Sequence, residues 1–413
     1  MLKIIHFNYN IASNVNVGDE AHVLAIQDML HARQPHVEFV NWPIGWLSQT
    51  QLPGKLAALP RWVQHASRVV KGNYVRRLLR EINAADMVLI GGGGVYIHSL
   101  LPLHRGLIEG ITAPIVLFGV GYNHNFGAPE FSPAALDGII ALGKKAKLQS
   151  VRDAETQHFL QALGVPSTLV ADPAMFLEPQ AATDSEPPPA APFWRPAYRA
   201  RVNRYPVPLE VNVLQNGAAG GGSATALPAP KQGAVAVGLN IAAHGWKQQQ
   251  AHMEKIVQAY AEFARTLAAS RPVQFYYFVH HPGELAAVAA LKARGVQLAA
   301  VVQGNARAMR AAYAGMDVVV SMMLHSAILA FGAGVPTVAV GYDTKNRSFM
   351  ELTGQQGRYI DVQHVTAPQL VQAASAVLAH KKTTAAALAS TKATLRTRSD
   401  AFTEQVVALL NDK

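Results

Sequence analysis

Short apolar runs alternate with amphipathic segments over the first 180 residues of the chain. The runs predict β-strands, and the segments, in which apolar positions recur every three or four residues, predict α-helices. We expect strands at residues 2–7, 87–90, 115–118 and 148–151, and helices at residues 19–32, 75–84 and 133–144. Strands that alternate with helices are typical of a parallel sheet covered by helices.

The same alternation resumes after residue 233. Strands are expected at residues 234–240, 273–279, 318–320 and 337–340, and helices at 248–269, 306–314, 326–331 and within 367–410. Between the halves, residues 181–233 are rich in Pro, Ala and Gly, so they bury too little apolar surface to offset the entropy of ordering and are predicted to be a linker or an insertion. The fold class is therefore α/β, with two Rossmann-like domains at residues 1–180 and 234–413 and a ligand cleft between them.

An uncharged apolar stretch that is long enough to cross a bilayer follows Asp317. Gly332, Gly334 and Pro336 interrupt it, so we interpret it as a buried strand–helix–strand unit instead of a membrane span. His325 lies inside this stretch. A buried imidazole needs a hydrogen-bond partner or faces a cleft, and the second case makes His325 a candidate acid or base.

Composition excludes several kinds of chemistry. The chain of 413 residues has no cysteine, which rules out disulfides, thiolate metal sites and a cysteine nucleophile. No basic segment leads into a long apolar stretch at the start, so no secretory signal is predicted and the protein is expected in the cytoplasm.

The net charge of +10 points to anionic partners, either nucleic acid, phosphorylated metabolites or an anionic membrane surface. Arginines and lysines are densest in residues 61–80, where they alternate with apolar residues. This segment is interpreted either as a surface that contacts the inner face of the cell membrane or as an ordinary solvated helix face. No nucleic-acid-binding motif accompanies it, so no nucleic-acid partner is expected.

Polar residues and glycines follow two strands of the first half. Gly18, Asp19 and Glu20 open a helix after the first strand, where Asp19 is either an acceptor for substrate hydroxyls, a base, or only a helix cap. The glycine run 91–94, with Gly92 and Gly93 at its centre, either lets the backbone approach an anion or serves tight packing.

Arg152 ends another predicted strand, at the edge of the sheet where parallel α/β folds bind ligands. It is suited to bind a carboxylate or phosphate, or it forms a structural pair with Asp153 or Asp172. His280-His281-Pro282 and His244-Gly245-Trp246 lack acidic partners at metal-ligand spacing, so they are interpreted as cleft-rim or structural residues and no metal site is expected. No cofactor is expected either.

The order of these motifs resembles the polysaccharide pyruvyl transferase family. The resemblance rests on N-V-G-D-E-A at residues 16–21, G-G-G-G-V at 91–95, S-V-R-D-A-E-T at 150–156, L-G-V at 163–165, D-P-A at 172–174, V-G-L-N-I at 237–241, L-H-S-A-I-L-A at 324–330, G-V-P at 334–336 and Y-D-T-K at 342–345. It spans nearly the whole chain except residues 181–233, and it implies a fold similar to the glycosyltransferase B architecture.

The resemblance implies transfer of the enolpyruvyl group of phosphoenolpyruvate to two hydroxyls of a sugar, in a surface polysaccharide or its lipid-linked precursor. The product would be a pyruvate ketal. His325 and Asp19 are then the expected catalytic residues, because the reaction moves protons. Donor binding is expected from Arg152, Lys345, Ser326 and Tyr342, and substrate contacts from Gly18, Gly92, Gly93 and Asp172.

One position departs from the family pattern. The family usually has arginine two residues before the histidine, and this chain has Met323. Arg307, Arg310 or Arg347 are candidates to supply the missing charge. Two alternatives therefore stay open, a glycosyltransferase-like group transferase with a different activated donor, and a non-catalytic glycan-binding relative.

Overall fold

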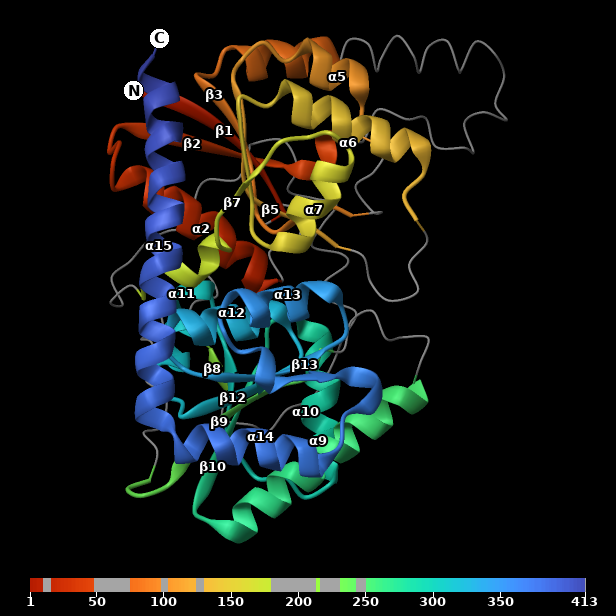
Figure 1. Cartoon of the computed structure of the whole chain (residues 1–413), viewed down its shortest axis with the longest axis vertical. Helices are drawn as coiled ribbons and strands as arrows, with labels where there is room; N and C mark the ends of the chain where they lie inside the picture. The colour runs from red at the N-terminus through yellow and green to blue at the C-terminus, as the bar shows by residue number, and fades with distance from the viewer. Residues whose placement is uncertain are drawn as a thin grey trace. The chain divides into compact units, whose positions relative to one another are not determined.

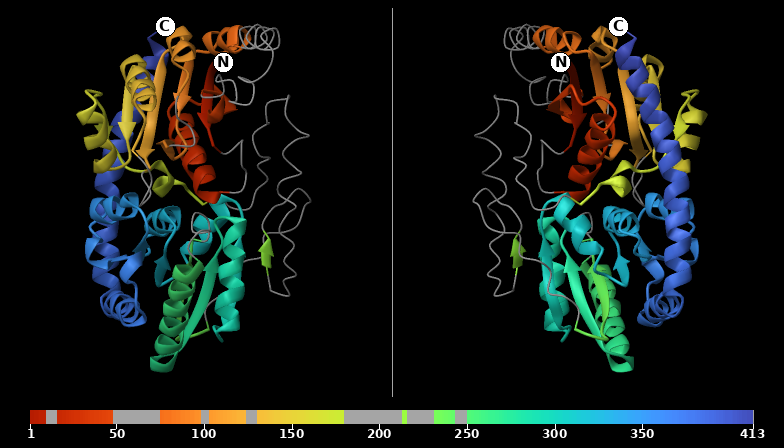
Figure 2. Two further views of the ribbon diagram at one scale, coloured as in Figure 1. Left: turned by 90° about the vertical axis from the view of Figure 1, so that its right-hand side faces the viewer. Right: turned by 90° about the vertical axis from the view of Figure 1, so that its left-hand side faces the viewer.

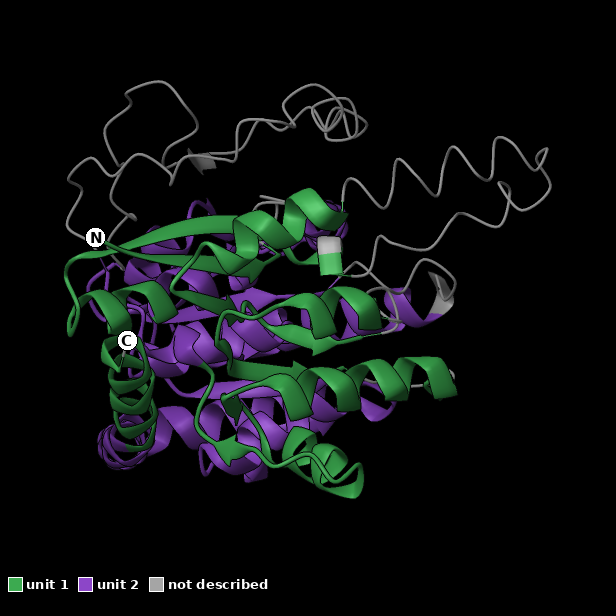
Figure 3. Cartoon of the chain, turned by 90° about the horizontal axis from the view of Figure 1, so that it is seen from above, with its two compact units in different colours: residues 1–13, 26–172, 398–413 green, residues 14–25, 173–397 purple. Residues whose placement is uncertain are grey.

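The computed structural model describes residues 1–9, 16–47, 75–97, 103–123, 130–179, 213–215, 231–242 and 250–412. The chain forms two compact units, shown in different colours in Figure 3. Unit 1 contains residues 1–13, 26–172 and 398–413, and unit 2 contains residues 14–25 and 173–397. Both units are thus assembled from segments that are far apart in the sequence.

Unit 1 is built on a 7-stranded sheet whose strand pairs are all parallel (Figure 1). Its order is β2-β1-β3-β5-β6-β7, with β4 paired to β5. The strands are β1 (Leu2–Asn8), β2 (Val37–Pro43), β3 (Met87–Ile90), β4 (Gly94–Tyr96), β5 (Ile115–Tyr122), β6 (Leu148–Val151) and β7 (Thr168–Leu169). Its helical segments are α2 (Val17–His31), which begins in unit 2, residues 75–83, α5 (Arg105–Gly110), α6 (Pro133–Lys145), α7 (Ala154–Ala162) and the short turn η1 (Ile44–Leu47).

Unit 2 has a second 7-stranded parallel sheet, of order β14-β13-β12-β9-β10-β11-β8. Helices flank the strands of each sheet (Figure 1 and Figure 2). The strands are β8 (Val213–Gln215), β9 (Val235–Asn240), β10 (Val273–Phe278), β11 (Leu298–Gln303), β12 (Val318–Ser321), β13 (Thr337–Gly341) and β14 (Tyr359–Asp361). The helices are α9 (Gln250–Ser270), α10 (Leu285–Ala293), α11 (Ala306–Tyr313), α12 (Leu324–Gly332), α13 (Thr344–Leu352), α14 (Ala367–Ala379) and α15 (Lys381–Asn411), with short turns η2 (Pro173–Phe176), η3 (Pro282–Glu284), η4 (Gln356–Arg358) and η5 (Val362–His364).

The packing of unit 2 follows from strand periodicity. Alternate residues of each central strand point to the same face of a sheet. Val237 and Leu239 of β9 and Val318 and Val320 of β12 share one buried core cluster with side chains of α9, α10 and α14. These three helices therefore cover one face of the sheet, and burial of their apolar side chains stabilises the unit.

Most predicted elements are confirmed, because short apolar runs form buried strands that helices flank. The stretch after Asp317 forms β12, α12, β13 and the start of α13, and every residue of α12 is buried. Among the described residues, no helix combines the length and the apolar character that a membrane crossing requires.

Six strands were not expected, namely β2, β4, β7, β8, β11 and β14. Of these, β2 contains polar and partly exposed residues, and β7 and β14 are too short for a periodic signal. Of the predicted linker, residues 213–215 form the edge strand β8, which pairs with β11, and residues 231–233 are also described. The rest of the linker and residues 61–74 of the basic segment lie outside the described residues.

The end of α15 belongs to unit 1, whereas the sequence-based boundary places it in the second domain. Its contacts explain the difference. Phe402 packs edge-on against Phe118 of β5 with ring centroids 5.0 Å apart. Arg33, just after α2, forms an ion pair of 2.8 Å with Asp400 and a second ion pair with Glu404.

Candidate functional site

His325 is the second residue of α12, at the carboxyl end of the buried strand β12. Only 7% of the residue is exposed. Met323 precedes the helix as its N-cap residue and makes no side-chain cap hydrogen bond. The Met323 N–H instead donates to Oδ1 of Asn240, at the end of the neighbouring strand β9, over 3.0 Å. The start of α12 is therefore fixed by a contact across the sheet.

Gly18 packs directly against the His325 ring within unit 2. A Cβ atom on Gly18 would lie 2.1 Å from Nδ1 of His325, a distance that side chains do not tolerate. The preceding Val17 N–H donates to the carbonyl of His280 over 3.2 Å, which ties the start of α2 to the end of β10. The structure thus brings the G-D-E and L-H-S motifs together, and Gly18 makes room for the imidazole.

The two acids that follow Gly18 have different surroundings. Oε2 of Glu20 accepts a hydrogen bond of 2.9 Å from the N–H of Ala306, the first residue of α11. Burial raises the pKa of Glu20, and this hydrogen bond opposes the increase. Glu20 therefore caps another helix, whereas Asp19 is half-buried next to Gly18, one residue from the His325 contact.

Ser326 follows His325 and is fully buried. Its hydroxyl lies 2.8 Å from the hydroxyl of Tyr313, which lies 2.8 Å from Nε2 of His280. The side chain of Ser326 therefore points into the interior of unit 2, and donor contact by Ser326 stays a prediction.

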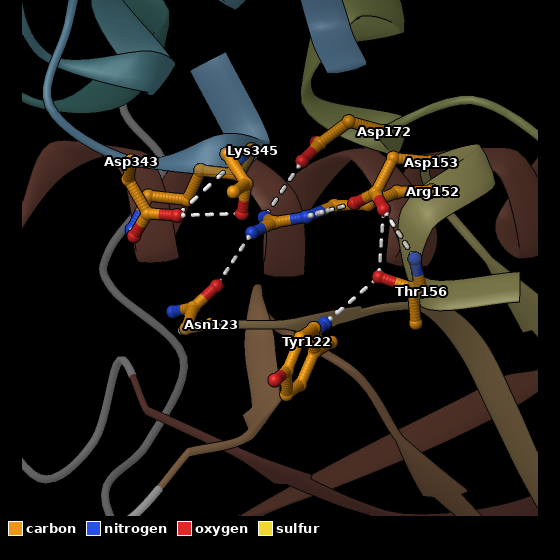
Figure 4. A network of polar contacts seen from close by, with 9 residues as sticks. Tyr122, Asn123, Arg152, Asp153, Thr156, Asp172, Asp343 and Lys345 are labelled. Atoms are coloured by element: carbon orange, nitrogen blue, oxygen red, sulfur yellow. Dashed lines mark hydrogen bonds and ion pairs between the residues drawn. The ribbon is translucent and has the colours of Figure 1, made fainter. Parts of the chain in front are cut away.

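Tyr342 lies beside Met323, the N-cap residue of α12, and Lys345 lies beside Tyr342. The Tyr342 hydroxyl is 3.7 Å from the sulfur of Met323, and Nζ of Lys345 is 5.6 Å from the Tyr342 ring centroid. Nζ also forms an ion pair of 3.2 Å with Asp343, whose other carboxylate oxygen caps α13 (Figure 4). The phenol of Tyr342 thus contacts the residue before α12, and the cation of Lys345 lies next to that phenol.

Arg152 lies in unit 1, where its guanidinium is buried among polar partners (Figure 4). Nη1 is 3.0 Å from Oδ2 of Asp172, and Nη2 donates to Oδ1 of Asn123 over 3.2 Å. Gly121 allows this arrangement, because a Cβ there would lie 2.4 Å from Nε of Arg152. These contacts match the interpretation of Arg152 and Asp172 as a structural pair, and an anion would have to compete with Asp172.

Asp153 supports the same cluster from the start of α7. Its Oδ1 accepts from the N–H and the hydroxyl of Thr156, over 2.7 and 2.8 Å. The Thr156 hydroxyl accepts from the N–H of Tyr122 over 2.9 Å. Burial raises the pKa of the Asp153 carboxyl, although the Arg152 charge opposes this.

Gly92 and Gly93 turn the chain sharply after β3. Their φ angles of 108° and 106° lie in a region that disfavours side chains. The Gly93 carbonyl accepts from the N–H of Gly121 over 3.1 Å, and a Cβ on Gly94 would lie 2.1 Å from Nδ2 of Asn123. The glycine run therefore packs closely on the end of β5, and its contact with substrate stays a prediction.

The three arginines considered as substitutes for the family arginine have other contacts. Arg310 donates to the carbonyl of Gly332, at the opposite end of α12 from His325. Arg307 donates to the carbonyl of Glu178 over 3.0 Å, and Arg347 lies 4.0 Å from Asp361. Met323 itself is 4% exposed and belongs to the apolar core cluster.

Sequence reasoning missed Glu284 and Tyr313, which are linked to the start of α12 through hydrogen bonds. It interpreted His280 only as a cleft-rim or structural residue, and it gave Asn240 no role. Glu284 is fully buried, and its Oε2 accepts from the His280 N–H over 2.8 Å and from Nδ2 of Asn240 over 2.9 Å. Burial raises the pKa of Glu284 to about 8 and lowers the pKa of His280 to about 3. The available signal was positional, because Asn240 ends β9 and His280 follows β10, at the edge where parallel sheets bind ligands.

Glu284 gives a prediction for stability against pH. An ordinary glutamate has a pKa of 4.5, so between pH 4.5 and about 8 the unfolded chain has lost this proton while the folded protein retains it. The contribution of Glu284 to the free energy of unfolding is therefore largest below pH 4.5. It decreases by roughly 3–5 kcal/mol between pH 4.5 and about 8, and it does not change further above pH 8. Chemical unfolding from pH 4.5 to 9 should show this loss in the wild type and a flatter profile in Glu284→Gln. Parallel profiles would contradict the assignment.

Among the described residues, no group of three or more His, Cys, Asp or Glu side chains is placed to hold a metal ion. His280 and His281 are among these residues, whereas His244-Gly245-Trp246 lies outside them.

Comparison with solved structures defines the class of protein. A UDP-GlcNAc 2-epimerase from Neisseria meningitidis is 9% identical, with a TM-score of 0.55 and 100% of each chain covered. A putative UDP-N-acetylglucosamine 2-epimerase from Listeria monocytogenes is 12% identical, with a TM-score of 0.54 and coverage of 94% of this chain and 90% of that chain. The Anabaena protein HepE, solved with UDP and glucose, is 14% identical, with a TM-score of 0.50 and 100% of each chain covered. The two parallel sheets and these neighbours define an α/β fold of the glycosyltransferase B type.

The family follows from the sequence match. The family model for polysaccharide pyruvyl transferase matches residues 16–344, and the chain therefore belongs to this family of transferases. No curated protein matches the chain. The matched span contains His325, Gly18, which contacts its ring, and Tyr342, which contacts Met323.

Proposed function

We propose that the protein transfers the enolpyruvyl group of phosphoenolpyruvate to two hydroxyls of a sugar, forming a pyruvate ketal on a surface polysaccharide or its precursor. The observation that carries the proposal is the placement of His325 in the first turn of α12, with its ring against Gly18, inside the span that matches the family. A nearly buried imidazole at the carboxyl end of a parallel strand is a suitable proton donor and acceptor.

The chemistry requires one addition and one substitution at the same carbon. The oxygen of one sugar hydroxyl bonds to C2 of phosphoenolpyruvate and loses its proton, while C3 gains a proton. The second hydroxyl oxygen then replaces the phosphate oxygen at C2, and its proton leaves with the released phosphate. We assign proton transfer to His325, acceptance of a hydroxyl proton to Asp19, and binding of the donor's anionic groups to Lys345.

A direct assay tests the assignment. Purified protein is incubated with phosphoenolpyruvate and a panel of glycosides, including lipid-linked ones, and released phosphate is measured with the mass of each glycoside. We expect phosphate release that depends on an acceptor, with a mass gain of one pyruvate ketal on that acceptor. If phosphate release and the mass gain were both absent with every acceptor, the proposed donor and product would be wrong.

Met323 favours a second candidate, a group transferase that uses a different activated donor. A buried thioether stands where the family usually carries a guanidinium, and thioethers do not neutralise a trianionic donor. The same glycosides are therefore tested with nucleotide sugars in place of phosphoenolpyruvate. Turnover of a nucleotide sugar alone would select this candidate. Glycan binding without turnover of either donor, retained in His325→Ala, would indicate a non-catalytic relative.

A further inference from the structure

The turn between β10 and α10, residues 280–284, is a buried junction of polar contacts in unit 2. Glu284 stands at its centre and accepts from the His280 N–H over 2.8 Å and from Nδ2 of Asn240 over 2.9 Å. His280 is 1% exposed and Glu284 is fully buried. Polar groups are costly to bury, so their arrangement is fixed by the need to satisfy one another.

The first connection from this turn leads to the residue before α12. Because Glu284 and the Phe278 carbonyl both accept from Nδ2 of Asn240, the amide is held with its oxygen toward Met323. Oδ1 then accepts from the Met323 N–H over 3.0 Å. Since α12 makes no side-chain N-cap bond of its own, this contact orients its first turn.

The second connection leads to the residue after His325. Nε2 of His280 lies 2.8 Å from the Tyr313 hydroxyl, which lies 2.8 Å from Oγ of Ser326. The Tyr313 ring is itself stacked on Phe278, with centroids 3.9 Å apart and an angle of 11° between planes. The hydroxyl of Tyr313 is thus held in place between the turn and α12.

The third connection leads to the segment that covers the imidazole. The His280 carbonyl accepts from the N–H of Val17 over 3.2 Å. The next residue, Gly18, contacts the His325 ring. The turn is therefore connected to the residue two positions before His325, to the residue after it, and to the backbone that contacts its ring.

We propose that the 280–284 turn, acting with Asn240 and Tyr313, positions the His325 imidazole. Asn240, Tyr313 and His280 are positioning residues because they contact Met323, Ser326 and Val17, at the starts of α12 and α2. Glu284 is a positioning residue that acts through Asn240 and His280. The inference rests on the proposed function only for its kinetic consequence, and the placement of the ring is measured independently of turnover.

The test removes one hydroxyl and leaves its ring. Tyr313→Phe keeps the stack on Phe278 and deletes the link to Ser326. The matched control is Tyr260→Phe in α9, because Tyr260 is also fully buried and its hydroxyl has no hydrogen-bond partner among the described residues. The ring signals of His325 in ¹⁵N-histidine-labelled protein, assigned by their loss in His325→Gln, report the imidazole. Turnover and thermal unfolding are measured on the same samples.

We expect Tyr313→Phe to shift the His325 ring signals and to lower kcat about 10-fold with little change in KM for the donor. Tyr260→Phe should change neither. Unchanged His325 signals in folded Tyr313→Phe would overturn the inference, even if phosphoenolpyruvate is the donor. Shifted signals together with no ketal formation by the wild type would instead sustain the positioning role and reject the proposed reaction.

A second pair of variants covers the case in which Tyr313→Phe does not fold. Glu284→Gln keeps an oxygen that can accept from Asn240 and from the His280 N–H, whereas Glu284→Ala removes it. The His325 signals of Glu284→Gln should stay close to those of the wild type, and those of Glu284→Ala should shift. Wild-type signals in both variants would contradict the proposal.

Discussion

Replacing His325 with glutamine should lower kcat for ketal formation by about 10² to 10⁴-fold, the usual contribution of a general acid–base residue. Glutamine can form hydrogen bonds and is compatible with a helix, but it does not exchange a proton near neutral pH. Because Lys345 and Tyr342 remain in place, KM for phosphoenolpyruvate should change much less than kcat. Steady-state phosphate release, measured with the best acceptor of the panel, gives both constants.

His364→Gln is the matched control for this variant. His364 lies in η5 of the same unit and its side chain is exposed, so the same substitution there should leave kcat at the wild-type value. Retention of more than about a third of the wild-type kcat in His325→Gln would remove His325 from proton transfer, since even a modest catalytic proton transfer contributes more than this. Phosphoenolpyruvate would remain the donor in that outcome.

The fold was predictable where a single physical cause determines an element. Strands β3 and β6 begin and end at the predicted residues, because their short apolar runs are buried within a parallel sheet. The apolar stretch around α12 was predictable as strand, helix and strand from its glycines and proline. In contrast, β14 has three residues, all partly exposed, so no hydrophobic pattern marks it.

The site was predictable only as far as single motifs extend. His325 and Gly18 were identified in separate motifs, but their contact depends on how α2 packs on α12. The charge of Arg152 suggested an anion site, whereas its geometry shows Asp172 and Asn123 already bound to the guanidinium. Such pairings join the ends of different strands, and register between strands is not encoded in any one segment.

The contacts among Asn240, His280, Glu284 and Tyr313 could not be predicted, for a related reason. A sequence shows that His280 and Glu284 are titratable, but not that burial keeps both of them uncharged near neutral pH. Asn240 was part of a recognised motif without an assigned role, and its role depends on the simultaneous position of Met323 and Glu284. Tertiary contacts therefore determine which of the polar residues support the site.

Gly18→Ala should abolish most of the activity while leaving the protein folded. The added Cβ would lie 2.1 Å from Nδ1, 2.2 Å from Cγ and 2.6 Å from Cβ of His325, so the imidazole and the start of α2 cannot both keep their positions. A displacement of this size at a reacting group lowers kcat by about 10²-fold. Alanine favours a helix over glycine by up to about 1 kcal/mol, so the gain in α2 offsets part of the cost to stability.

Gly357→Ala is the control for this last variant, because a Cβ at Gly357 in η4 has no heavy atom within 4 Å. It should leave both kcat and the His325 ring signals unchanged. If Gly18→Ala retained the wild-type kcat with unshifted His325 signals, the tight contact would have no functional consequence. If instead kcat fell while the His325 signals stayed in place, the loss would point to Asp19, the neighbouring residue on α2, since the altered backbone also carries that carboxylate.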